Sequence, residues 1–187
     1  MPLLFATTNE GKVIEAVRVL SSFGVSVEHA AVDVPEPKTL DLEETIRAKA
    51  EIAFNLVGEP VVVEDTGLFL DAYPNFPGTY TKYSVQTIGL PGILKLLEGK
   101  PRGAEFRTAV ALASADGVFV FWGSVRGTIS ESFAGDSHVK LPFDSVFIPE
   151  GSAKTFAEMG AEKDADSHRA RAFRALGEWL SKEAALE

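Results

Sequence analysis

The sequence contains no cysteine. Disulfide bonds, thiolate zinc sites and cysteine nucleophiles are therefore excluded. No apolar run approaches the roughly 18 residues of a membrane span, and the N-terminus lacks a charged-then-apolar signal pattern. Basic residues are scarce, with 18 against 27 acidic residues and a net charge of -9. We therefore expect a soluble cytoplasmic protein that binds neither membranes nor nucleic acids, since non-specific nucleic-acid binding needs a broad basic surface.

What is present is the composition of an ordinary globular protein. Hydrophobic residues make up 45% of the chain and charged residues 24%, which provides enough apolar material for a core. The length suits a single domain over residues 1–187, with two lobes. Because the chain is acidic, any polyanion that it binds must meet a local basic cluster or a metal ion.

The spacing of hydrophobic residues predicts both strands and helices. Strands are expected at residues 3–7, 25–34, 61–63, 105–114, 118–126 and 143–149, and helices at 12–23, 41–57, 91–98 and 166–185. The tripeptide Ala-Asp-Gly joins two of these strands and is a hairpin signal. Strands alternate with helices early in the chain. This order predicts an α/β fold with a mixed twisted sheet, flanking helices and two lobes around a central cleft.

A polar loop joins the first predicted strand to the first predicted helix. It contains Thr8 and Asn9, and Lys12 follows in the first helical turn. Free backbone N–H groups and the helix dipole make such a helix start an anion site, and a lone cation there opposes the dipole. Lys12 therefore favours a bound anion. The simpler interpretation is that Thr8 or Asn9 only caps the helix.

The second long helix begins at Asp41, which forms the pattern of a capping box with Glu44. Lys49 lies on the buried stripe of this helix, seven residues after Leu42. A lysine in that position usually extends outward to solvent, but it can also reach into a cleft. Structural and functional roles therefore both stay open for Glu44 and Lys49.

Two adjacent carboxylates, Glu64 and Asp65, end the hydrophobic run at residues 61–63. Open α/β sheets bind ligands at the carboxyl ends of their strands. Carboxylate oxygens also suit Mg²⁺, which combines one or two of them with phosphate oxygens and water. One of the two can instead act as a general base toward water. The structural alternative is that Asp65 caps a turn with Thr66 and Gly67.

A second cationic helix start is predicted near residue 166. Lys163 precedes it, and His168 and Arg169 lie in its first turn, with Arg169 four residues before Phe173 on the buried side. Cations at a helix N-terminus oppose the dipole, so a bound anion explains them most simply. A solvated basic face is the alternative. Two cationic helix starts and a carboxylate cluster together fit a phosphate-rich ligand with Mg²⁺.

Six short motifs follow one another along the chain. They are "TTNEGK" followed by Glu15, "VEDTGL", "PGTY", "FIPEG", "TFAEM" and "EKDADSHRARA". In this order they resemble the inosine triphosphate pyrophosphatase family over nearly the whole chain. The resemblance implies a two-lobed α/β fold with a deep nucleotide-binding cleft, and a homodimer. It also implies hydrolysis of ITP, dITP and XTP to the monophosphate and pyrophosphate, which cleanses the nucleotide pool.

The same resemblance implies roles for individual residues. Glu44 and Asp65 would serve Mg²⁺ and the attacking water, with Asp65 as the general base. Lys49 would assist at the phosphates or at the water. The residues that would contact the substrate are Thr8, Asn9 and Lys12 on the triphosphate, and Lys163, His168 and Arg169 around the base and the phosphates.

One stretch departs from the family pattern. The family usually shows a Phe-Gly-Trp/Tyr-Asp-Pro run in its base pocket, whereas residues 141–145 read Leu-Pro-Phe-Asp-Ser. Phe143 retains an aromatic ring that can stack on a base, and Asp144 retains the carboxylate. Pro142 and Ser145 change the backbone that reads the edge of the base, so base selectivity is the property that the departure affects most.

These residues allow three hypotheses. The first is a Mg²⁺-dependent pyrophosphatase for hypoxanthine and xanthine nucleotides, in which cations and metal offset the charge of phosphoryl transfer. The second keeps the chemistry and moves the substrate to other modified nucleotides. The third is a nucleotide-binding sensor without turnover. The combination of Glu44, Lys49 and Asp65 favours an enzyme, because binding alone needs no water-activating carboxylate.

Overall fold

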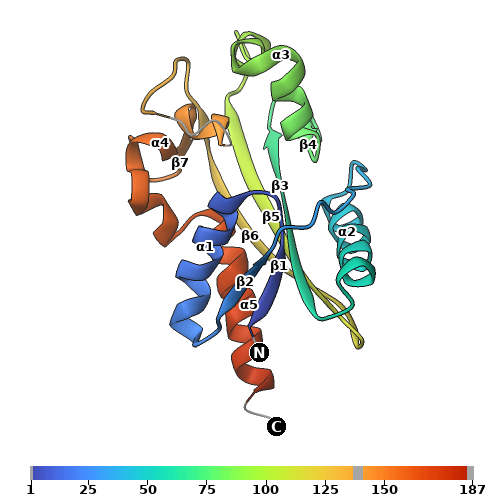
Figure 1. Cartoon of the computed structure of the whole chain (residues 1–187). Coiled ribbons are helices and arrows are strands. Elements are labelled where there is room, and N and C mark those ends of the chain that lie inside the picture. Colours follow the sequence, from blue (N-terminus) through green and yellow to red (C-terminus); the bar gives the residue numbers. More distant parts are fainter. Residues whose placement is uncertain (1, 137–140, 185–187) are drawn as a thin grey trace.

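The computed structural model describes residues 2–136 and 141–184. They form one mixed sheet with helices on both faces, which confirms the predicted fold class (Figure 1). The strands are β1 Leu3–Ala6, β2 Val27–Ala30, β3 Val61–Leu70, β4 Pro77–Gly78, β5 Gly103–Ser114, β6 Gly117–Ile129 and β7 Phe147–Pro149. Their order is β2-β1-β3-β5-β6-β7, and β4 pairs with β3. The strand β1 is parallel to β2 and β3, and the other pairs are antiparallel.

Helices cover both faces of this sheet. They are α1 Glu10–Leu20, α2 Leu42–Val57, α3 Thr81–Leu96, α4 Phe156–Met159 and α5 His168–Glu183. The helices α1 and α5 lie against one face and α2 lies against the other (Figure 1). Among the described residues, no helix combines the length and the apolar character that crossing a membrane would need.

Side chains of β3 alternate between the two faces, as the two-residue period of a strand requires. Val61 and Val63 belong to the hydrophobic cluster under α2. Val62 belongs to the cluster under α1 and α5. Because the alternation continues along the strand, Glu64 and Asp65 leave β3 on opposite faces.

A third hydrophobic cluster lies at the other end of the sheet. It includes Leu68 from β3, Phe106 from β5, Ile93 from α3 and Phe147 from β7. The long strands β3 and β5 contribute residues to all three clusters. They therefore connect the part of the molecule that carries α1, α2 and α5 to the part that carries α3 and α4, in agreement with the expected two lobes.

The strand β3 is much longer than the one expected at residues 61–63. It continues to Leu70 because β5 pairs with it antiparallel along all 10 of its residues. The sequence Glu-Asp-Thr-Gly is typical of a turn, but the neighbouring strand supplies hydrogen-bond partners that keep it extended. Asp65 therefore lies inside a strand, and the turn-capping interpretation is wrong.

The helix expected at residues 91–98 is the second half of α3. This helix begins at Thr81 and is interrupted at Gly89, whose φ of 65° and ψ of 173° are not helical. The interruption lies two residues before Pro91, which has no N–H to donate and is well placed at the start of a helical segment. The first half of α3 was not among the helices predicted from the sequence.

Two C-terminal elements also differ from the expectation. Residues 142–145 form a 3-10 turn, so only β7 remains of the strand expected at 143–149. The last helix begins at His168, and its cap is Ser167, whose side chain accepts from the Ala170 N–H. The end expected at residue 185 lies outside the described residues.

The backbone of α5 packs directly on β6 at Gly123. A Cβ added there would meet the backbone oxygen of His168 and lie 2.5 Å from the backbone nitrogen of Ala172. Backbone atoms cannot rotate away, so we expect Gly123→Ala to lower the free energy of unfolding by about 2–3 kcal/mol. Urea unfolding followed by circular dichroism measures this loss.

Gly58→Ala is the matched control. Gly58 caps α2 with a φ of 76°, and a Cβ there would meet nothing within 4 Å. Its expected cost is the left-handed strain alone, about 1 kcal/mol. Equal losses for the two variants would contradict direct packing of α5 on Gly123.

Candidate active site

A cavity of about 480 Å³ is lined by residues of α1, α2, α3, α5 and β3, a size typical of small-molecule sites. Its basic residues are Lys12, Lys38, Lys49, Lys82, Lys163 and Arg169, and its acidic residues are Asp33, Glu36, Asp65 and Asp144. The lining therefore carries a surplus of positive charge within an acidic chain. This is the local basic cluster that a bound polyanion requires.

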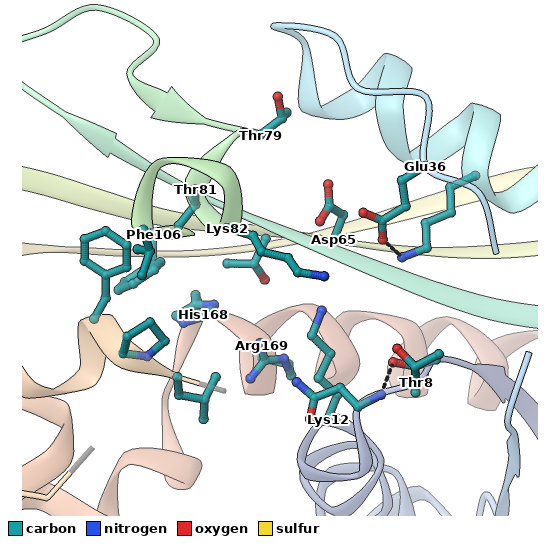
Figure 2. Close-up of a pocket in the computed structure, with 18 of the residues that line it drawn as sticks. Thr8, Lys12, Glu36, Asp65, Thr79, Thr81, Lys82, Phe106, His168 and Arg169 are labelled. Carbon is teal, nitrogen blue, oxygen red and sulfur yellow. Dashed lines mark hydrogen bonds and ion pairs between the residues drawn. The ribbon is translucent and has the colours of Figure 1, made fainter. Parts of the chain in front are cut away.

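Figure 2 shows Phe106 and His168 at one end of the cavity and Thr8 and Glu36 at the other. We call the first the aromatic end, formed by Phe106, Phe143, Asp144, Lys163 and His168. We call the second the polar end, formed by Thr8, Asn9, Lys12, Glu36, Lys38, Lys49 and Asp65. A ligand that fills both ends must combine a flat ring with a strongly charged group.

The start of α1 forms one wall of the polar end. Asn9 caps this helix, because its Oδ1 accepts from the Gly11 N–H at 3.0 Å and its own N–H donates to Thr7 Oγ1 at 3.1 Å. The capping interpretation is therefore confirmed for Asn9. Thr8 and Lys12 also line the cavity, so the same helix start faces the space where an anion would bind.

Glu64 is fully buried and is paired with cations from two helices. Lys12 Nζ of α1 forms an ion pair with its Oε2, and Arg169 Nε of α5 is 3.3 Å from its Oε1. Arg169 also contacts Glu15 Oε2 through Nη1 at 2.8 Å. Burial acts to raise the pKa of Glu64, but Lys12 and Arg169 outweigh it and hold that pKa far below its usual range. Glu64 is therefore ionised in the folded protein.

Asp65 leaves β3 on the opposite face. Lys38 Nζ is 2.6 Å from its Oδ2 and 3.2 Å from Glu36 Oε2. Lys49 Nζ contacts Glu36 Oε1 and donates to the backbone carbonyl of Glu64 at 3.0 Å. Lys49 thus reaches into the cavity instead of extending to solvent. The contacts thus run from Asp65 to Lys38, Glu36 and Lys49, so that carboxylates and ammonium groups alternate.

The carboxylates of this cluster differ in proton affinity. Burial raises the pKa of Asp65, against the opposing effect of Lys38. Burial acts in the same direction at Glu36, but Lys49 and Lys38 outweigh it and lower its pKa. A carboxylate with a raised pKa accepts protons more readily. Asp65 is therefore better suited than Glu36 to take a proton from water.

The aromatic end is built on Phe106. Its ring stacks on that of His168, with centroids 4.6 Å apart and planes 19° apart. Phe143 meets Phe106 edge-on at 6.3 Å. Lys163 Nζ is 2.7 Å from Asp144 Oδ2. Aromatic walls beside a paired lysine and carboxylate suit a planar heterocycle that carries hydrogen-bonding groups.

His168 is almost completely buried within this wall, with 3% of its surface exposed. Burial lowers its pKa well below 6.5, and the positive charges of Arg169 and Lys163 lower it further. At neutral pH the imidazole is therefore uncharged.

All but one of the site residues predicted from the sequence line this single cavity. They are Thr8, Asn9, Lys12, Lys49, Asp65, Phe143, Asp144, Lys163, His168 and Arg169. They come from segments that are far apart in the sequence, and the fold brings them together. The individual roles assigned to them remain predictions.

Glu44 is the exception. Its side chain is exposed and does not line the cavity, which corrects the prediction that it serves a metal ion there. It precedes Lys49 by five positions on α2, which at 100° per residue places the two side chains about 140° apart around the helix. Because Lys49 faces the cavity, Glu44 faces away from it.

Glu36 takes the position expected of Glu44. The segment Pro-Glu-Pro-Lys at residues 35–38 holds no helical pattern, and prolines keep the residues before them extended. In an extended segment, residues two apart lie on the same side. Lys38 therefore contacts Asp65 while Glu36, on the same side, contacts Lys38. This two-residue spacing was the signal from which the sequence could have identified Glu36. Phe106 and Lys82 were also missed, and Figure 2 shows Lys82 pointing into the middle of the cavity.

A family model described as the Ham1 family matches residues 3–179. The chain belongs to the Ham1 family. A protein named dITP/XTP pyrophosphatase from Hyperthermus butylicus is 47% identical over 180 residues, which cover 95% of this Ham1-family chain and 94% of the relative. A protein of the same name from Saccharolobus solfataricus is 45% identical over 176 residues, with coverages of 93% and 91%.

A solved structure also matches this Ham1-family chain. It is described as a nucleoside-triphosphatase / dITP/XTP pyrophosphatase from Mycobacterium abscessus, with 33% identity and a TM-score of 0.71. The match covers 94% of this chain and 98% of the other. The cavity thus belongs to a fold that the family shares.

The lowered pKa of His168 predicts how the stability of this Ham1-family chain changes with pH. Below about pH 6.5 the unfolded chain binds a proton at His168 that the folded chain does not bind. The contribution of His168 to the free energy of unfolding is therefore fully present above this pH and is lost as the pH falls. We expect His168→Gln to remove up to about 1.4 kcal/mol per pH unit of this dependence. Urea unfolding of both proteins at several pH values measures it. Parallel stability–pH curves would show that His168 titrates normally.

Proposed function

We propose that this chain hydrolyses non-standard purine nucleoside triphosphates, namely ITP, dITP and XTP, to the monophosphate and pyrophosphate. The observation that carries this proposal is the joining of a cationic polar end and an aromatic end in one cavity. The names of the Ham1-family relatives, dITP/XTP pyrophosphatase, support two of these substrates, dITP and XTP. The expected role is removal of these nucleotides from the pool. The homodimer and the cytoplasmic location that the resemblance implies stay predictions.

The triphosphate is proposed to lie along the polar end. Thr8 and the start of α1 offer donors, and Lys12 and Lys82 offer charges directed into the cavity. Lys82 forms no ion pair with another described residue, so its charge is available without breaking an existing contact. Phosphate oxygens gain negative charge during the reaction, and fixed cations stabilise that charge.

Glu36 and Asp65 are proposed to hold Mg²⁺. Their oxygens both contact the Lys38 ammonium group, and this shared contact with a positive charge supports the proposal. No described group of three acidic, histidine or cysteine residues forms a complete metal site. Mg²⁺ does not require one, since it uses one or two carboxylates with phosphate oxygens and water. When bound, it would neutralise charge on the phosphate oxygens.

Asp65 is proposed to position the attacking water and to accept its proton. The raised pKa of this carboxylate makes it a stronger base than an exposed aspartate. Attack at the α-phosphorus would release pyrophosphate, whereas attack at the γ-phosphorus would release phosphate. Which product appears therefore reports where the water is held.

Variants of Asp65 and Glu36, which line the cavity, can be compared with a variant of Glu44, which does not. We expect Asp65→Asn to lower kcat by about 10²-fold or more, and Glu36→Gln to lower activity by about 10- to 100-fold through weaker metal binding. Steady-state pyrophosphate release at saturating Mg²⁺ measures the Asp65→Asn loss. The same assay across a Mg²⁺ titration measures the Glu36→Gln loss, because saturating Mg²⁺ offsets weaker metal binding.

Glu44→Gln is the control for this pair. It removes the same kind of charge from the exposed start of α2, so kcat and KM should match those of the unmodified protein. Loss of activity in Glu44→Gln together with normal activity in Glu36→Gln would restore the assignment made from sequence.

The test of the proposed function is a panel of triphosphates incubated with the protein and Mg²⁺. The panel contains ITP, dITP, XTP, GTP, ATP and a modified pyrimidine nucleotide, with separate assays for pyrophosphate and phosphate. We expect pyrophosphate from ITP, dITP and XTP, with kcat/KM at least about 10²-fold above that for ATP. Preference for the pyrimidine would support the second hypothesis, and binding without products would support a sensor.

A further inference from the structure

A chain of three hydrogen bonds connects Glu64 to His168 beside the cavity, which Thr66 and His168 line. Thr66 Oγ1 donates to Glu64 Oε1. The hydroxyl oxygens of Thr66 and Thr108 are 2.6 Å apart, and Thr108 Oγ1 is 2.6 Å from His168 Nδ1. All four side chains lie on the face of the sheet that α5 covers, because Glu64 and Thr66 are two residues apart on β3 and Thr66 is paired with Thr108 on β5.

The ionised carboxylate fixes the direction of every bond in this chain. Glu64 is held between Lys12 and Arg169 and can only accept. Thr66 has one hydroxyl proton and gives it to Glu64, so its oxygen must accept the proton of Thr108. The Thr108 oxygen must then accept from His168 Nδ1–H. The reverse orientation of Thr108 would place two hydroxyl oxygens 2.6 Å apart with no proton between them.

The direction of the bonds determines the tautomer of His168. A neutral imidazole carries one proton, and here that proton is on Nδ1. The lowered pKa of this residue agrees with a neutral ring. Nε2 therefore presents a bare lone pair. No described residue hydrogen bonds to Nε2, and the side chain lines the cavity, so this lone pair is available to a ligand.

We propose that Thr66 and Thr108 are positioning residues that hold His168 as the Nδ1–H tautomer, so that Nε2 accepts a hydrogen bond from N1–H of a 6-oxopurine. This inference rests on the proposed function. Hypoxanthine and xanthine carry a hydrogen on N1, whereas N1 of adenine is itself an acceptor. Adenine would therefore place two lone pairs against each other, which a desolvated site rejects strongly. Guanine also carries N1–H, so His168 does not exclude GTP.

Two further contacts support a recognition role for the ring. Stacking on Phe106 at 4.6 Å fixes the ring plane, and burial of Thr108 excludes water that could replace its hydroxyl. Glu64, which directs the chain of hydrogen bonds, also pairs with Lys12 and Arg169. One buried charge thus fixes both the base-reading tautomer and two cations proposed for the phosphates.

The tautomer is measured directly by ¹⁵N-resolved NMR of the histidine rings at mildly alkaline pH, with the His168 signals assigned by their loss in His168→Gln. We expect His168 Nε2 to resonate as an unprotonated nitrogen and Nδ1 as a protonated one. His29 is an internal reference of the opposite kind, since its Nε2 lies 2.7 Å from the Thr7 carbonyl and must carry the proton. A protonated Nε2 on His168 would overturn the inference, and this measurement needs no catalysis.

A matched pair of variants tests the effect on selectivity. Thr108→Val keeps the shape but removes the acceptor of Nδ1–H, so the tautomer is released. We expect the ratio of kcat/KM for ITP to that for ATP to fall by about 10-fold or more. Thr108→Ser keeps the hydroxyl and should retain the ratio within about 2-fold. If Thr108→Val fails to fold, Thr66→Val gives the same test, because Thr66 is only half-buried.

The NMR measurement and the kinetic comparison together distinguish failure of this inference from failure of the proposed function. If the unmodified protein releases no pyrophosphate from ITP, the proposed function fails whatever the NMR spectrum shows. If ITP is hydrolysed and ATP rejected, but Thr108→Val and Thr66→Val both keep the original ratio, the inference is overturned while the function stands. A reduced ratio in the valine variants that the serine variant restores supports the inference.

Discussion

The buried carboxylate of Glu64 interacts with Lys12 from α1 and Arg169 from α5, and these ion pairs set the position of both helix starts. A charge without solvent contact is tolerated only when it is paired, and removing one partner of such a pair typically costs about 3–5 kcal/mol. The loop before α1 and the first turn of α5 are therefore held against β3. Both the donors at Thr8 and the ring of His168 depend on this arrangement.

The two-residue period of β3 gives its adjacent carboxylates different chemistry. Glu64 faces two cations and has a strongly lowered pKa, whereas burial raises the pKa of Asp65 on the other face. When environments push two neighbouring carboxylates apart in pKa, they can take separate roles in one site. Glu64 provides a fixed charge, and Asp65 is the group suited to accept a proton. A strand, and not a turn, makes this separation possible.

Ten residues of the cavity lining were predicted from the sequence, some from local patterns and some from the family resemblance. Cationic residues at two helix starts, Lys12 and Arg169, oppose the helix dipole and so indicated a bound anion. Glu44 could not be judged in this way, because a capping box and a metal ligand share the same sequence pattern. Its place is taken by Glu36, in a proline-containing segment without periodicity. Only the path of that segment beside β3 brings Glu36 to Asp65.

The sequence by itself determined the mixed α/β sheet, the absence of cysteine chemistry and ten of the residues that line the cavity. Hydrophobic period, helix-end composition and short motifs are local properties, so the sequence shows them directly. The tertiary structure alone decided how those residues are paired. Strand pairing with β5 kept residues 64–70 extended and so separated Glu64 from Asp65. It also placed Thr66 beside Thr108, and the packing of α5 brought His168 to that pair. These contacts join residues 42 and 60 positions apart, and no local pattern encodes a partner at such a distance.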